Sequence, residues 1–178
     1  VVYHYVPELP MLDVNIAFAA GSAYDGQQFG LSALTTRLLD QGNGGLDAGT
    51  IADQFADVGA QYGGATSQDM LMLSFRSLTR PDALKQATAM FDLLINHPDF
   101  PEDAFLREKN QQLMSIKQSN ESPDTLAQDA FYQALYGHHP YGHTINGNKQ
   151  TVNALTREDV RHFYHQYLVS KNTVIALV

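Results

Sequence analysis

The chain has 178 residues, 44% of them apolar, and this predicts one domain, residues 1–178, with a sizeable hydrophobic core. It contains no cysteine, which excludes disulfides, thiolate nucleophiles and cysteine-based zinc sites. Its formal net charge of −8 argues against nucleic acid as a partner, and no apolar run approaches the roughly 18 residues needed to span a bilayer.

The first third of the chain is predicted to contain two strands and two helices. Residues 1–6 and 11–20 have the composition and alternation of strands. Leucines at helical spacing predict a helix from Leu31 to Leu38, with Gly42 as its stop signal. A second helix is expected around residues 51–58, where apolar side chains again recur at helical spacing.

The rest of the chain is predicted to contain a hairpin, several helices and a last strand. The hairpin joins residues 60–67 to residues 70–78, with Leu71, Leu73 and Phe75 sharing one face. Prolines open three helices, and a capping-box pattern opens another. The helices are expected to begin at Pro81, Pro101, Pro123 and Thr156, a glycine- and histidine-containing loop covers residues 136–147, and the last strand covers 172–178.

This order of elements is not the regular strand–helix alternation of a parallel sheet. It favours an α+β fold with a mostly antiparallel sheet and helices packed on one face.

Short segments in the same order along nearly the whole chain resemble one family. The turn Ala19-Ala20-Gly21-Ser22, the helix start Gly30-Leu31-Ser32-Ala33 and the segment Gly59-Ala60-Gln61-Tyr62-Gly63-Gly64 are three of them, and Tyr136-Gly137-His138-His139-Pro140-Tyr141-Gly142 is another. Together they resemble the insulinase/pitrilysin-like zinc metallopeptidases, which include the mitochondrial processing peptidase. The resemblance implies that the chain has the metallohydrolase fold of that peptidase. It also implies that the chain corresponds to the first of the two homologous halves of which family members consist.

Active members of that family carry the helical motif H-x-x-E-H, in which two histidines bind zinc and the glutamate is the general base. The resemblance places Ala33, Thr36 and Arg37 at these three positions. It places the distal glutamate ligand near Ser115, with Met114 as the neighbouring possibility. None of the four is a usual zinc ligand or base. We therefore predict a degenerate site with no catalytic residue and no bound metal, zinc being the cofactor of active relatives.

Arg37 suggests a further hypothesis. Its guanidinium would stand roughly where the zinc charge stands in active relatives, and it would pair with a carboxylate such as Asp40 or Glu108. The alternative is an ordinary solvated arginine on a helix.

Other polar clusters are interpreted as structural. His138, His139 and His143 are close in sequence, but Pro140 and Gly142 prevent a helix from setting their geometry, and they are expected to form a structural loop. Five acidic residues are expected at strand ends and helix caps rather than in catalysis; they are Asp13, Asp25, Asp69, Glu102 and Asp103. His162 and His165, three apart on a predicted helix, are likewise interpreted as packing or surface residues.

The strand of Gly63, Gly64, Ala65, Thr66 and Ser67 is the remaining candidate binding element. The resemblance implies that a peptide substrate adds to this strand as an extra strand, held by main-chain hydrogen bonds that do not need zinc. The alternative is an ordinary strand whose glycines permit close packing.

The leading functional prediction is a non-catalytic, peptide-enclosing half or subunit of a two-part peptidase. Its expected partners are a peptide or unfolded polypeptide and a second homologous half or catalytic subunit, and a dimer in the periplasm is favoured. An active zinc endopeptidase with an unconventional ligand set and a structural or assembly module are the two alternatives.

Overall fold

A computed structural model describes residues 1–4 and 10–178 of the chain. Within these residues, five strands form one sheet in the order β1-β7-β2-β6-β5. All neighbours in the sheet run antiparallel except β1 and β7, which run parallel. The strands are β1 (Val2–Tyr3), β2 (Met11–Phe18), β5 (Gln61–Thr66), β6 (Leu71–Leu78) and β7 (Thr173–Leu177), and residues 5 and 6 of the predicted first strand lie outside the described residues.

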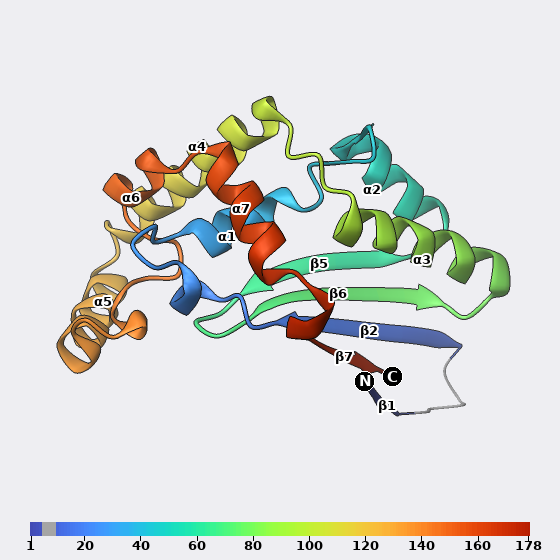
Figure 1. Ribbon diagram of the computed structural model, residues 1–178, viewed down its shortest axis with the longest axis horizontal. Coiled ribbons are helices and arrows are strands. Elements are labelled where there is room, and N and C mark those ends of the chain that lie inside the picture. Colours follow the sequence, from blue (N-terminus) through green and yellow to red (C-terminus); the bar gives the residue numbers. More distant parts are fainter. Residues whose placement is uncertain (5–9) are drawn as a thin grey trace.

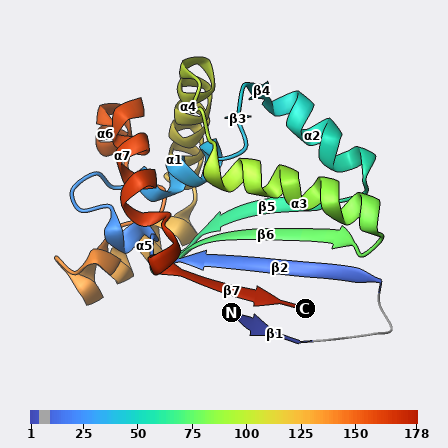
Figure 2. The same ribbon diagram turned by 45° about the vertical axis from the view of Figure 1, so that its right-hand side comes forward.

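The helices lie on one side of this sheet, as Figures 1 and 2 show, and the predicted α+β arrangement is confirmed. They are α1 (Leu31–Leu38), α2 (Ala48–Asp57), α3 (Pro81–Asn96), α4 (Glu102–Ser119), α5 (Pro123–Tyr136), α6 (Lys149–Ala154) and α7 (Arg157–Tyr167). The described residues also form three short 3₁₀ helices: η1 (Ser22–Tyr24) before α1, η2 (Pro140–Gly142) between α5 and α6, and η3 (Ser170–Asn172) before β7. None of the helices in the described ranges has the length and apolar character needed to cross a bilayer.

Two small features were not predicted. Two very short strands, β3 (Gly42–Asn43) and β4 (Leu46–Asp47), pair across the turn at Gly44 and Gly45 as a separate two-stranded sheet. The helix α6 follows the predicted loop and is opened by Asn148, whose side chain accepts hydrogen bonds from two backbone N–H groups. Both features are too short to show a periodic apolar pattern.

The core lies between the sheet and the helices. Buried and exposed residues alternate strictly along β6, so that Leu71, Leu73 and Phe75 share one face, as predicted. This is the buried face, which meets the helices. The Phe75 ring stacks on Phe91 of α3 with 4.8 Å between ring centroids, and it meets Phe55 of α2 edge-on at 6.4 Å. This aromatic cluster fixes α2 and α3 to the sheet.

The opposite face of the sheet is not covered by any helix of the described chain (Figures 1 and 2). The strand register places Val174, Ala17 and Met72 side by side across three strands. Val174 is 62% exposed and Met72 is 39% exposed, so these side chains form a small apolar patch on this face, next to the ion pair of Asp13 and Arg76.

Candidate functional site

The helix α1, which carries three of the four degenerate positions, is held at its start by a buried carboxylate. Asp25 accepts hydrogen bonds from the N–H groups of Gly30 (2.7 Å) and Ser32 (2.8 Å) and is only 4% exposed. Burial raises the pKa of Asp25 to about 7, although the N–H groups of Ser32 and Gly30 oppose this rise. Asp25 is thus an anchor for the helix start, in keeping with the structural role expected for it.

A second anchor of α1 was not predicted. Gln112 of α4 is fully buried, and its side-chain N–H₂ group donates to the carbonyls of Gly30 (3.0 Å) and Asn146 (2.9 Å). It therefore joins α4, the start of α1 and the segment before α6. Nothing in the sequence marks this residue, because a glutamine on a polar helix is ordinarily solvated.

The fold encloses α1 almost completely. Seven of its eight residues are buried, and the exception is Arg37. The helix packs against α4, α7 and the strand β5. The hydroxyls of Thr35 and Thr36 are used within the helix, where they donate to the carbonyls of Leu31 (2.8 Å) and Ser32 (2.9 Å).

The four degenerate positions do not form a donor set that fits zinc. Ala33 offers a methyl group, Arg37 a permanent cation, and the hydroxyls of Thr36 and Ser115 donate to carbonyls of their own helices. In residues 1–4 and 10–178, no three His, Asp or Glu side chains are grouped so that they could hold a metal ion.

The histidine loop makes structural contacts. His139 accepts a hydrogen bond from the Tyr141 N–H group at 3.2 Å, and His143 stacks on Phe29 with 4.0 Å between ring centroids. The Tyr141 hydroxyl donates to the Asp69 carboxylate, so the loop is attached to the turn between β5 and β6.

The structure places α1 directly on the candidate peptide-binding strand. The hydroxyls of Thr36 and Thr66 lie 2.7 Å apart, which joins the centre of α1 to the end of β5. A Cβ atom on Gly64 would lie 2.9 Å from Thr36 Cγ2, so this close approach requires a glycine. Gly64 therefore has a packing role, as the alternative interpretation of this strand expected.

The strand β5 lies at one end of the sheet, and in the described part of the chain its only neighbour is β6. The Ser67 N–H group donates to the Met70 carbonyl at 2.8 Å, so Ser67 and Met70 are a hydrogen-bonded pair at the end of the β5–β6 ladder. Because hydrogen-bonded pairs alternate in an antiparallel ladder, the backbone groups of Tyr62, Gly64 and Thr66 point away from β6. These groups form a free edge next to α1.

The predicted ion pair of Arg37 with Asp40 or Glu108 does not form. Within residues 1–4 and 10–178, Arg37 has no ion pair. Asp40 accepts a hydrogen bond from Gln41 at 2.7 Å and lies beside Tyr62, whose pKa is raised to about 12 by burial and by this carboxylate. Glu108 lies 3.4 Å from Arg107 instead. Both carboxylates thus have nearer donors than Arg37.

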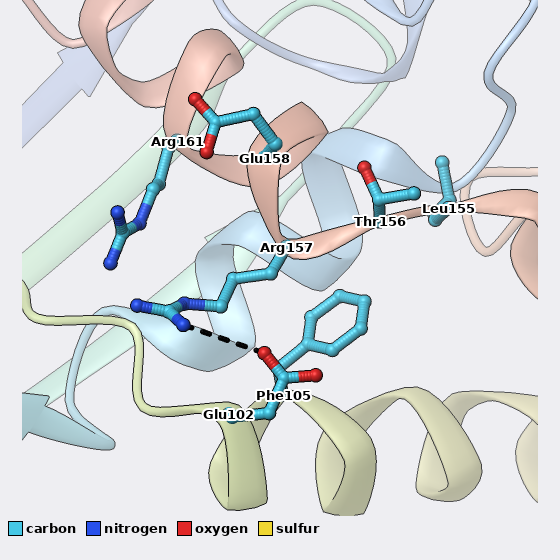
Figure 3. A pocket seen from close by; sticks show the side chains of 7 residues that line it. All are labelled: Glu102, Phe105, Leu155, Thr156, Arg157, Glu158 and Arg161. Carbon is cyan, nitrogen blue, oxygen red and sulfur yellow. Dashed lines mark hydrogen bonds and ion pairs between the residues drawn. The ribbon is translucent and has the colours of Figure 1, made fainter.

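A pocket of about 420 Å³ lies between the starts of α4 and α7, and Figure 3 shows the side chains that line it. Arg157 and Arg161 come from α7, and Arg157 lies 3.4 Å from Glu102 of α4. Glu158 supplies a second carboxylate, so the charges in the pocket are balanced. The lining includes no residue of α1 or β5, and we assign it no part in the site.

Comparison with known proteins identifies the family. A family model described as insulinase (peptidase family M16) matches residues 1–149. A crystal structure titled as a peptidase M16 inactive domain from Pseudomonas fluorescens superposes with a TM-score of 0.97 and 36% identity, over 99% of this chain and 43% of that one.

Two curated relatives are more distant in sequence. A protein named as a non-peptidase homolog, YmxG of Helicobacter pylori, is 24% identical over 99% of this chain and 41% of its own length. An uncharacterized zinc protease of Rickettsia bellii is 20% identical over 97% of this chain and 42% of its own length. The chain spans less than half the length of these relatives. It belongs to the insulinase, or M16 peptidase, family.

Proposed function

We propose that this chain is a non-catalytic member of the M16 family that holds an extended peptide along β5. The observation that carries the proposal is the donor set on and beside α1: a methyl group, two hydroxyls bonded to carbonyls, and a guanidinium. The names of two similar proteins, an inactive M16 domain and a non-peptidase homolog, support it. The zinc protease name of another relative is the reason to test it directly.

The proposed role also needs a second half or a partner subunit to close over the peptide. Similar proteins are more than twice as long as this chain, which supports residues 1–178 as one half of a two-half unit. The free edge of β5 supports peptide binding, because strand addition uses main-chain hydrogen bonds and needs no metal. Dimer formation and a periplasmic location remain predictions.

We expect the purified protein to hold no stoichiometric zinc at these positions and to cleave no peptide in a chelator-sensitive way. The measurements are elemental analysis after dialysis and a peptidase assay with and without chelator. A related peptidase with an intact H-x-x-E-H helix is the positive control. One tightly held zinc per chain that is lost when α1 is mutated would favour the active-enzyme alternative.

Peptide binding is tested with short extended peptides whose backbone is N-methylated at alternate residues. A peptide that adds to β5 donates from only one set of alternate residues. We therefore expect methylation of that set to abolish binding, and methylation of the other set to leave binding nearly unchanged. Equal effects of the two sets, or no peptide binding at all, would contradict the proposal and favour a structural or assembly module.

A further inference from the structure

Arg37 is the one residue of α1 that is not buried, and its helix packs against the strand proposed to hold the peptide. The other seven residues of the helix are buried. Arg37 directly follows Thr36, whose hydroxyl contacts Thr66 of β5 at 2.7 Å. A strand added to the free edge of β5 would lie about 4.8 Å beyond it, within the reach of an arginine side chain that starts next to Thr36.

The charge of Arg37 is not neutralised within the described chain. The protein has 19 Asp and Glu residues against 11 Lys and Arg residues, so carboxylates are plentiful. Asp40 and Glu108 are the two carboxylates that the sequence suggested as partners of Arg37. In the structure, Asp40 accepts a hydrogen bond from Gln41, and Glu108 forms an ion pair with Arg107. Arg37 therefore presents an unpaired guanidinium, whose forked N–H donors match the geometry of a carboxylate.

We propose that Arg37 binds a carboxylate of the peptide that lies along β5, so that the chain prefers extended peptides with an acidic group opposite α1. The group is an Asp or Glu side chain or the carboxylate at the end of the peptide. This inference rests on the proposed peptide binding. Its physical basis is a charge-assisted hydrogen bond between the guanidinium and the peptide carboxylate.

The test compares peptides that differ in one charge. The probes are acetylated and amidated Val/Thr peptides in which a single Glu is moved along the strand, each matched by the same peptide with Gln. A further Gln peptide carries a free terminal carboxylate. We expect the full-length protein to bind one Glu peptide about tenfold more tightly than its Gln match, with the difference shrinking at high salt. If the terminal carboxylate is the ligand, the free-ended peptide shows the gain instead.

Three variants assign the preference to Arg37. Arg37→Gln is expected to remove the preference for the charged peptide without weakening the Gln peptide, and Arg37→Lys to keep part of it, because lysine retains the charge but not the fork. Arg80→Gln makes the same change in net charge at the start of α3, where Arg80 is exposed and paired with Asp82 at 2.8 Å. This control is expected to behave like the wild type.

The outcomes separate the two proposals. Equal binding of charged and neutral peptides at every position, or a preference that survives in Arg37→Gln, would overturn the role of Arg37 and leave strand addition standing. Failure of every peptide to bind, or binding that ignores N-methylation, would overturn the proposed function and this inference with it. Thermal unfolding of each variant confirms that folding is unchanged.

Discussion

Replacing Asp25 with asparagine is expected to flatten the pH dependence of stability between about pH 4 and pH 7. Burial raises the pKa of Asp25 from 3.8 to about 7 in the folded chain, so the folded state binds this proton more tightly than the unfolded state. The stabilisation of the folded state by protonated Asp25 is fully present below about pH 4 and is lost as the pH rises through 7. It amounts to at most about 4 kcal/mol, since each pKa unit corresponds to about 1.4 kcal/mol.

The measurement is urea unfolding of the wild type and of Asp25→Asn across this pH range. The difference between the two free energies of unfolding isolates Asp25, because every other ionisable group is present in both proteins. Asp25→Asn is also expected to have a lower free energy of unfolding at every pH, because asparagine cannot accept hydrogen bonds from both Gly30 and Ser32 as the carboxylate does. Asp53→Asn, at an exposed position of α2, is the control and should keep the wild-type profile. Parallel curves for wild type and Asp25→Asn would contradict the prediction.

Replacing Phe75 with alanine is expected to lower the free energy of unfolding by about 3–5 kcal/mol. The side chain is 2% exposed and contacts the rings of both Phe91 and Phe55. Its removal would leave a cavity between the sheet and two helices, in addition to the lost burial of an aromatic ring. Denaturant unfolding at one pH measures the change.

Ser74→Ala is the matched control, because Ser74 is the neighbouring residue on β6 and faces the uncovered side of the sheet. Its hydroxyl makes only a long 3.4 Å contact with the Gly63 carbonyl, so a change below about 0.5 kcal/mol is expected. A loss below about 2 kcal/mol for Phe75→Ala would mean that the surrounding helices close over the vacated space.

The parts of the fold that the sequence predicted are those with a regular local signal. The division of β6 into two faces was predicted correctly, because side chains on a strand have a period of two. Thr156 and Asp159 form the expected capping box, with hydrogen bonds in both directions. The two-residue strands β3 and β4 and the six-residue helix α6 are too short for such a signal.

The candidate site was predictable in composition but not in geometry. The resemblance to a family motif assigns Ala33, Thr36 and Arg37 to the zinc-site positions by spacing along the chain, and this assignment stays a prediction. The contact of Thr36 with Thr66 joins residues 30 positions apart and depends on the absence of a side chain at Gly64. The failure of Arg37 to pair with a carboxylate likewise depends on which donors happen to lie closer in space. Both are properties of tertiary packing that no local pattern reports.

The position of β7 in the sheet has a consequence for how the chain folds. This strand is formed by the last residues of the described chain, but it lies between β1 and β2, which are formed by the first. During synthesis, β2 therefore stays without its neighbour on that side until residues 173–177 have left the ribosome. Pairing over such a sequence separation is slow, and an unpaired strand edge can meanwhile join another nascent chain. Completion of this sheet is thus a late event, at which protection by a chaperone would matter most.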